Sequence, residues 1–445
     1  MRLLLLLLIA LAAGRARADS LGTVVASVED PPREIVDFDV RGKSKLTIRA
    51  LRYLSHYEEG DAVRRRDIPK IVRALISSEL FETVAVTFED APGGVMVVAT
   101  LKDKHSWVVA PTFYFLSGKR SLGVGYAENN FRGNNQKFLM YGQVGERDSL
   151  FFGTFLDNNV RGTDLTLRAD VYVYKRILDE YVNPVDDPTN DEIARTTESY
   201  YLGAGFLLGW NFDWWAIADL RLRGAYVYYQ DPHAPDGSAL PAPSIDGYDF
   251  TSQFRLTLDA RHHYFGVTWG PYLQLFAETS IPGLDDYDYS SALLRAYYSW
   301  RLFTEHQLEL RTNLQVGRHL PIHEELVLGG PIDLRGYALD QFRGDARAMF
   351  RVEYSVPITK WKFFAFRAIG FWDTGYIGFQ FRDPDGRRNY LEGQANNTSW
   401  ARNDVGLGLR IYVKRIVLPL LGLDFAYGIE GKAPEVYFQV GLTDF

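Results

Sequence analysis

From residue 107 to the C-terminus, apolar and polar residues alternate along the chain with a period of two. Between 165 and 174, every second residue is apolar, and the residues between them are Thr, Arg, Asp and Tyr. The segments 254–261 and 308–316 repeat this pattern, with charges of both signs on the polar face. Such a period predicts β-strands with one apolar face, which would point inward in a soluble sandwich but outward in a membrane barrel. Periodicity by itself leaves both architectures open.

The lengths of the connections distinguish these two architectures. Long polar segments lie at 176–197, 230–247, 280–288, 318–345 and 379–400. The short connections include 158–162, 261–266 and 357–360, and the turn at 128–133 resembles the one at 157–162. Long loops on one side and tight turns on the other are typical of outer-membrane barrels. We therefore predict a transmembrane antiparallel β-barrel over residues 105–445. The alternating segments number about sixteen, an even number as such barrels require.

The N-terminus carries the features of an export signal. Arg2 is a short positive region, residues 3–11 are apolar, and Ala16-Arg17-Ala18 is a small-residue cleavage pattern. This order predicts a signal peptide at 1–18. No later stretch is apolar enough for a spanning helix, yet 14% of all residues are aromatic. An exported, aromatic-rich chain of this kind is typical of a membrane β-barrel.

Residues 19–104 have a different pattern, with a strand at 34–40 and a helix at 46–54. Asp67 can cap a second helix that has Pro69 in its first turn. Two alternating segments, 84–88 and 95–101, then predict a pair of strands. The order strand, helix, helix, strand, strand predicts a small α+β domain ahead of the barrel.

The sequence offers no signature of an enzyme. It lacks a Gly-x-Ser-x-Gly elbow, a His-Glu-x-x-His motif and a phosphate-binding loop, so we expect no catalysis and no cofactor. The absence of Cys excludes a disulfide framework, a zinc finger and thiol catalysis. His262-His263 sits at a predicted tight turn and is interpreted as solvated, so no metal site is expected. The net charge of −7 argues against nucleic acid as a partner.

Several segments resemble one bacterial family. Asp333-Leu334-Arg335-Gly336-Tyr337 follows Gly329-Gly330 in a long loop, and the chain ends in an aromatic-rich strand with Phe445 last. Segments 348–357, 371–375 and 404–410 continue the likeness. Together they resemble the bacterial surface-antigen superfamily, the BamA/TamA-like outer-membrane insertases and translocators. Residues 19–104 are similar to a single POTRA domain, whereas housekeeping insertases carry several, which favours a divergent paralogue.

The resemblance implies a site inside the barrel. In such proteins the long loop folds back into the lumen, and its Arg meets acidic residues of the inner wall. By this likeness Arg335 is that arginine, Gly336 and Tyr337 form the loop tip, and Glu353 and Asp373 are the acidic partners. Physical chemistry agrees, because an Arg carried into a confined lumen needs a carboxylate partner. Anchoring of the loop alone is the alternative role.

A second predicted site is the seam where the first barrel strand closes on the last. Pro111 is expected to open the first strand, and proline removes a hydrogen-bond donor of the ladder. A weakened seam and a simple strand start are the two interpretations of Pro111. In the last strand, Phe438 shares one face with the apolar residues at 440 and 442, whereas Phe445 has the opposite parity, which predicts a bulge.

The resemblance implies an outer-membrane protein that inserts or translocates other polypeptides. Its POTRA-like domain would lie in the periplasm and capture clients by strand addition, and the seam would open toward lipid. The expected partners are the outer-membrane bilayer, unfolded client polypeptides and periplasmic accessory proteins. A dedicated secretion pore for one partner protein and a passive porin or surface receptor are the alternatives.

Overall fold

The structure is a computed structural model, and the chain divides into two units that are described separately below. It describes residues 30–440, apart from 79, 117–118, 183–188, 190–191, 214, 265, 363, 382–388, 392–400 and 414–418. The predicted signal peptide at 1–18 and Phe445 lie outside the described residues. Among the residues that are described, no helix is both long enough and apolar enough to cross a bilayer.

The first unit is a small α+β domain. Its elements are β1 (Arg33–Lys43), α2 (Ile48–Ser55), β2 (Ala62–Val63), the short helix η1 (Arg65–Asp67), α3 (Ile68–Ser77), β3 (Phe81–Ala91) and β4 (Gly94–Asp103). The sheet has the order β2-β1-β4-β3, with β1 and β4 parallel and the other pairs antiparallel. Ile35, Leu51, Leu75 and Val97 are fully buried between the sheet and the helices. The predicted order of elements in this segment matches the observed one.

The N-terminal caps of α2 and α3 differ from the sequence prediction at one residue. Thr47 caps α2, because its side chain accepts a hydrogen bond from the amide of Ala50 at 3.3 Å. Asp67 precedes α3 but does not cap it; its carboxylate accepts from the amide of Arg64 at 2.9 Å instead. The prediction of an Asp67 cap was therefore wrong, because the turn of η1 directs this side chain backward.

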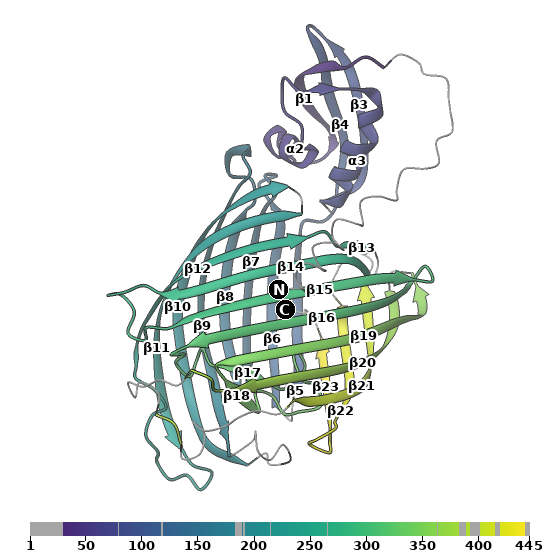
Figure 1. Ribbon diagram of the computed structural model, residues 1–445. Coiled ribbons are helices and arrows are strands. Elements are labelled where there is room, and N and C mark those ends of the chain that lie inside the picture. The colour runs from purple at the N-terminus through teal and green to yellow at the C-terminus, as the bar shows by residue number, and fades with distance from the viewer. Residues whose placement is uncertain are drawn as a thin grey trace, which may run out of the picture. The chain divides into compact units, whose positions relative to one another are not determined.

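The second unit is a closed antiparallel barrel (Figure 1). Its wall consists of β5 (Trp107–Leu116), β6 (Lys119–Phe131), β7 (Gln136–Gly145), β8 (Asp148–Asp157), β9 (Leu165–Tyr181), β10 (Ile193–Asp213), β11 (Ala216–His233), β12 (Gly247–Asp259), β14 (Val267–Ser280), β15 (Ser290–Leu302), β16 (His306–Arg318), β19 (Ala346–Trp361), β20 (Phe364–Gly378), β21 (Arg402–Val413), β22 (Pro419–Gly428) and β23 (Ala433–Val440). Within the described residues these are sixteen wall strands, and β13 (His262–Tyr264) is a short addition beside β14. The predicted barrel and its strand number are confirmed.

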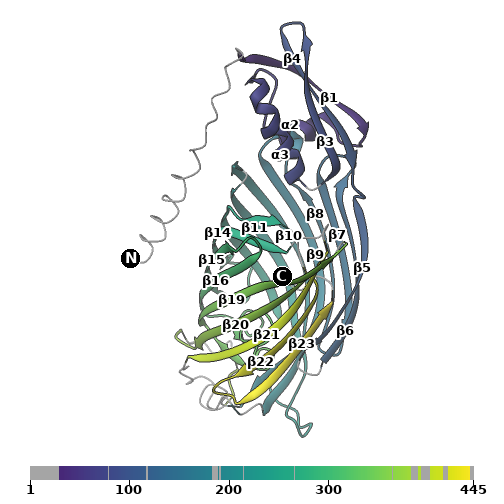
Figure 2. The same ribbon diagram turned by 90° about the vertical axis from the view of Figure 1, so that its right-hand side faces the viewer.

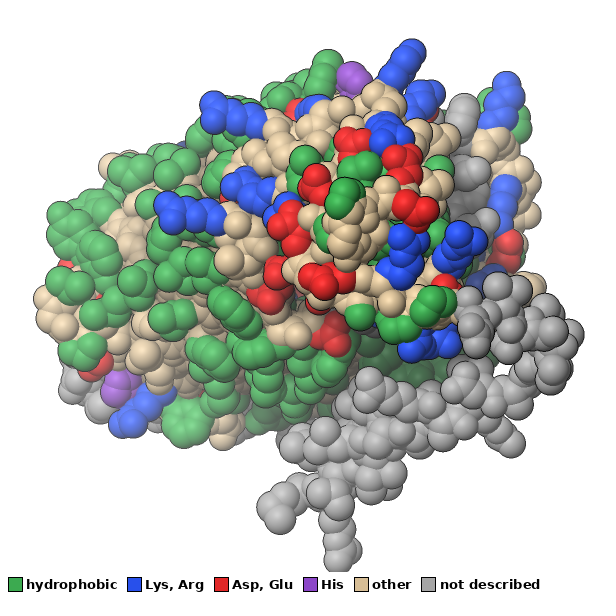
Figure 3. Space-filling view, turned by 90° about the horizontal axis from the view of Figure 1, so that it is seen from above, with side chains coloured by type: hydrophobic (Ala, Val, Ile, Leu, Met, Phe, Trp, Pro, Cys, Tyr) green, Lys and Arg blue, Asp and Glu red, His purple; other side chains and the backbone are tan. Residues whose placement is uncertain are grey.

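The exposure of side chains on the two faces of the wall shows whether the apolar face points inward or outward. On β10, Leu202 and Phe206 point outward and are 58% and 44% exposed. On the inner face, charged groups pair across strands, as in the bond from Arg255 Nε to Asp219 Oδ2 at 2.9 Å. Hydrophobic side chains cover much of the outer side of the barrel that is visible in Figure 3. The apolar face therefore points outward and the charged face lines the lumen, as in a membrane barrel.

Several predicted boundaries were wrong. Pro111 lies inside β5, paired with Val124 of β6, because the ladder extends back to Trp107. The expected turn at 357–360 belongs to β19, which continues to Trp361. Half of the expected long loop at 176–197 is strand, since β9 and β10 pair as far as Tyr181 and Ile193. His262 is exposed, but it belongs to β13 and not to a turn. Strand pairing extended each of these segments beyond its local sequence signal.

The two similar turns share one backbone conformation. Arg132 and Gly133 have φ values of 54° and 75°, and Arg161 and Gly162 have values of 54° and 86°. An Arg in the left-handed region is uncommon, whereas Gly adopts it without steric cost. The interpretation of one turn type used twice agrees with these angles.

Candidate functional site

The segment between β16 and β19, residues 319–345, is here named the luminal loop. It contains a small hairpin of β17 (Leu326–Leu328) and β18 (Phe342–Gly344). Its apolar side chains, such as Leu328 and Leu334, are fully buried in a cluster with Tyr201 of β10 and Val227 of β11. Because these wall residues face inward, the luminal loop packs inside the barrel. The sequence gives this loop an apolar core of its own, which most surface loops lack.

Arg335 lies between two carboxylates of the inner wall. Its Nε and second terminal nitrogen donate to the two oxygens of Asp373 at 2.8 and 3.1 Å, a bidentate pair. Its other terminal nitrogen donates to Glu353 Oε2 at 3.1 Å. The guanidinium also lies over the ring of Phe371, 3.3 Å from its centroid, in cation–π geometry. The structure thus brings together the arginine and both carboxylates that the sequence singled out.

Arg351 is a partner that sequence reasoning missed. It donates to both oxygens of Asp373, at 2.7 and 3.1 Å, so this carboxylate holds two guanidinium groups. It also donates to the carbonyl of Asp333 at 2.7 Å, which ties the wall to the loop backbone. The available signal was its position two residues before Glu353, because residues two apart in a strand share a face. The sequence could therefore place Arg351 on the luminal face, but it could not identify Arg351 as a partner of Asp373.

The loop tip reaches strands close to the seam. The amide of Gly336 donates to Asp404 Oδ2 of β21 at 2.9 Å. The hydroxyl of Tyr337 donates to Glu430 Oε2 at 2.5 Å. The hydroxyl of Tyr437, on β23, donates to the carbonyl of Tyr337 at 2.7 Å. Gly336 and Tyr337 therefore connect the luminal loop to the last strands of the barrel.

A Gly336→Ala substitution is expected to displace the loop tip. The added methyl carbon would lie 2.4 Å from the amide nitrogen of Gly428 and 2.6 Å from Cβ of Asp404. Overpacking of this kind costs about 1–3 kcal/mol. We expect faster proteolysis within the luminal loop of the folded protein. Gly142→Ala is the control, because no atom lies within 4 Å of its added carbon. Equal cleavage rates for both variants and the wild type would contradict the tight fit.

Asp340 fastens a second point of the luminal loop. Its Oδ2 accepts from Arg147, in the β7–β8 turn, at 2.6 Å and also from Arg176 of β9. Burial alone raises the pKa of the Asp340 carboxyl, but the guanidinium groups of Arg176 and Arg147 outweigh burial and hold that pKa below its ordinary value. The carboxylate is therefore ionised at neutral pH, and this ion pair is retained until the medium becomes strongly acidic.

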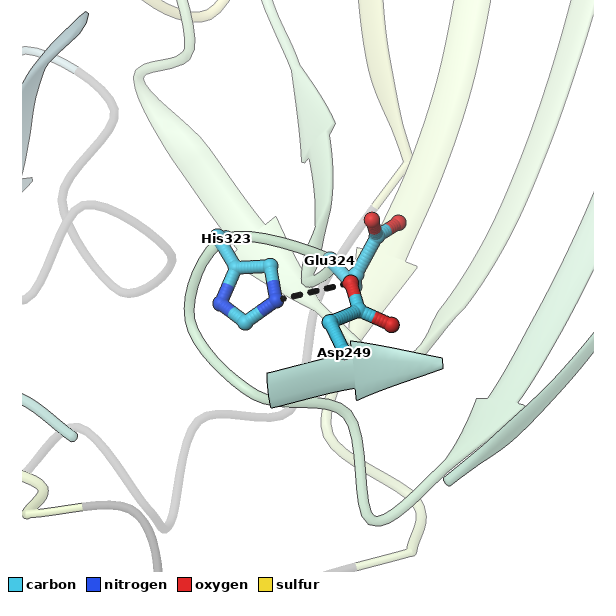
Figure 4. Close-up of side chains that lie close together, drawn as sticks. All are labelled: Asp249, His323 and Glu324. Atoms are coloured by element: carbon cyan, nitrogen blue, oxygen red, sulfur yellow. Dashed lines mark hydrogen bonds and ion pairs between the residues drawn. The ribbon is translucent and has the colours of Figure 1, made fainter. Parts of the chain in front are cut away.

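A third point is a cluster of Asp249, His323 and Glu324, shown in Figure 4. His323 Nε2 lies 3.3 Å from Asp249 Oδ2, and the three possible ligand atoms lie within 4.8 Å of one another, a spacing that could hold a metal ion. However, Arg223 of β11 already donates to Asp249 Oδ2 at 2.7 Å and to Glu324 Oε1 at 2.9 Å. Because this guanidinium supplies the positive charge, we interpret the cluster as an anchor between loop and wall. Sequence reasoning did not single out these residues.

The three anchors attach the luminal loop to widely separated parts of the wall. Glu324 is held by β11, Arg335 by β19 and β20, and Asp340 by β9 and the β7–β8 turn. Each anchor pairs a loop charge with an opposite wall charge inside the lumen. The loop therefore crosses the lumen and links several strands of the wall.

The seam joins β5 and β23, the first and last strands of the wall. Within the described residues, three pairs join the two strands: Phe115 with Phe438, Tyr114 with Gln439, and Phe113 with Val440. The rings of Phe113 and Phe438 are 6.2 Å apart across this seam, which lies on the side shown in Figure 2. Among the described seam pairs, none includes Pro111.

Comparisons with known proteins agree with this geometry. The family model of the Omp85 superfamily domain matches residues 130–443. BamA from Haemophilus ducreyi lacking POTRA domains 1–3 is 15% identical, with a TM-score of 0.62 over 91% of this chain and 84% of that one. CdiB from Escherichia coli is also 15% identical, with a TM-score of 0.64 over 92% and 76% of the two chains. CdiB from Acinetobacter baumannii is 15% identical, with a TM-score of 0.59 over 92% of this chain and 74% of that one. No curated protein gave a significant sequence match. At such identities the structural likeness concerns the fold.

Proposed function

This chain belongs to the Omp85 superfamily, and from that premise we propose that it inserts or translocates other polypeptides at a bacterial outer membrane. The resemblance carried by Arg335-Gly336-Tyr337 and the final strand is confirmed at the level of the family. Family membership supports both outer-membrane protein insertion and secretion. The outward apolar face of the barrel supports a place in the lipid bilayer.

The observation that carries this proposal is the closure of the wall by pairing of β5 with β23, its first and last strands. A strand with unpaired backbone groups is a template on which another strand can form. Every other pair of neighbouring wall strands is consecutive in the chain and has its own connecting segment, whereas β5 and β23 lie at opposite ends of the barrel sequence. Parting β5 from β23 therefore requires no movement of a connecting segment. The seam is therefore the place where a client strand would pair with the barrel.

The luminal loop would stabilise the barrel while this seam opens. Tyr337 and Tyr437 link the loop to β23, and Arg335 links it to β19 and β20. If the seam parts, these bonds hold the last strands against the loop and limit their movement. The wall then retains its shape while the backbone edges become available to a client.

The small α+β domain would receive clients before they reach the barrel. We infer that it is a POTRA-like module on the periplasmic side. Its sheet ends in β3, an eleven-residue edge strand, whereas the opposite edge is covered only by the two-residue β2. An extended client segment could add to the β3 edge through backbone hydrogen bonds. Periplasmic accessory proteins could bind the same domain.

We further propose that no covalent reaction and no cofactor take part. Several inner-wall charges are engaged in ion pairs that position the loop, such as that of Asp373 with Arg335 and Arg351. Folding of the client would itself supply the driving free energy, because pairing and lipid burial of a nascent strand are favourable.

Depletion of the protein from its host cell tests this proposal. Quantitative proteomics of the outer membrane is expected to show a several-fold loss of a set of β-barrel proteins. Loss of one secreted protein with an unchanged outer membrane would favour a dedicated secretion pore instead. If neither changes and the purified barrel conducts small solutes, a porin or receptor role replaces the proposal.

A further inference from the structure

The outward face of the barrel carries an apolar hollow, here named the outer trough. It has a volume of about 470 Å³ and lies across β12, β14, β15, β16, β19 and β20. Its floor is a row of small residues in register: Ala277 pairs with Ala292, and Ala346 lies two strands beyond. Phe254 and Tyr376 stand at its two sides. The volume is within the range of about 300–1,000 Å³ that is typical of small-molecule sites.

A polar row borders the outer trough on the side of the long loops. Ser252, Thr279, Ser290 and Arg318 are consecutive register partners on neighbouring strands. On each strand, the residue of the polar row lies two positions from a residue that lines the outer trough. The two sets of residues therefore share the outward face and are roughly 7 Å apart. Arg318 is exposed and forms no ion pair within the described part of the chain. Three hydroxyls and one unpaired cation therefore border the hollow.

The chemistry of the two rows fits a phosphorylated lipid that carries a sugar headgroup. The outward face of a membrane barrel is covered by hydrocarbon, so an acyl chain is the natural occupant of an apolar hollow there. A lipid-facing Arg is costly near the bilayer centre and much less so near the interface, where a phosphate can bind it. Hydroxyl groups beside that Arg can exchange hydrogen bonds with sugar hydroxyls.

We propose that the outer trough binds a phosphorylated, acylated glycolipid of the membrane. One acyl chain lies over Ala277 and Ala292, the phosphate pairs with Arg318, and the sugar contacts the hydroxyls of Thr279 and Ser290. The proposal needs only the membrane placement of the barrel and is independent of any client. The site is on the outside of the wall, away from the luminal loop and the seam.

Lipid retention by the full chain tests this site. The protein is folded in dodecyl maltoside micelles, incubated with bis-phosphorylated lipid A and examined by native mass spectrometry. We expect one retained lipid. Ala292→Trp, which fills the trough, and Arg318→Gln, which removes the charge, should each lower retention about tenfold or more. Ala204→Trp, at an exposed outward position of β10, and Arg318→Lys are the matched controls and should retain the lipid.

Three results would overturn the proposal. The first is equal retention by all variants, or equal retention of dephosphorylated lipid A, since the charge would then play no part. The second is equal retention of phosphatidylglycerol, because the sugar would then be irrelevant. The third is a dimer that Ala292→Trp abolishes, since a second copy of the chain would then occupy the trough. A heat-modifiable band on gels verifies that each variant is folded.

Discussion

An Asp373→Asn variant is expected to release the tip of the luminal loop while the barrel remains folded. Asp373 accepts four hydrogen bonds, two from Arg335 and two from Arg351, and all three side chains are buried. The neutral amide leaves Arg335 with Glu353 as its remaining carboxylate. Removing one member of a buried ion pair costs about 3–5 kcal/mol, and water in the lumen should bring the cost toward the lower figure.

The readouts for Asp373→Asn are protease sensitivity of the luminal loop and client assembly in cells. We expect rapid cleavage within residues 319–345 and loss of most activity. Asp424→Asn is the matched control, because Asp424 is also buried and is paired with Arg410 on the wall at 2.8 and 2.9 Å, and within the described residues it forms no hydrogen bond with the loop. A protease-resistant and active Asp373→Asn protein would show that this carboxylate does not hold the loop.

A disulfide across the seam is expected to abolish activity reversibly. Phe115 and Phe438 are direct partners on β5 and β23. Opposed residues of antiparallel strands have Cα atoms roughly 4.5–5.5 Å apart, which a disulfide can span. The chain has no Cys, so Phe115→Cys with Phe438→Cys introduces the sole pair. Under oxidising conditions the seam cannot part, and client assembly should stop; a reductant should restore it.

The control for this experiment is a disulfide at a junction that need not open. Leu122 of β6 and Val144 of β7 are direct partners, and both are exposed on the outward face. Leu122→Cys with Val144→Cys should leave activity unchanged under oxidation. If the seam-locked protein still assembles clients at the wild-type rate, lateral opening is wrong, and a fixed pore or a receptor becomes the better interpretation.

The family resemblance indicated both carboxylate partners of Arg335 but none of the other loop anchors. Glu353 and Asp373 fall in segments that resemble strands of the family. Asp340 and Arg147, by contrast, are 193 positions apart and belong to no local pattern. Likewise, the bonds of Arg223 to Asp249 and Glu324 join three separate segments. Such contacts depend on barrel closure, which brings distant strands to face one another.

What the sequence pattern by itself determined is the barrel and its polar lumen, whereas the entry of the long loop into that lumen was implied by the family resemblance. A period of two fixes which residues share a face, and one-sided long loops fix how the strands connect. The tertiary structure alone decided where strands end, because Pro111 and the segment 357–360 are held in strands by the ladders of β6 and β20. It also decided which residues meet at the seam and where the outer trough lies. Both depend on register between strands, which is a long-range property that local sequence does not encode.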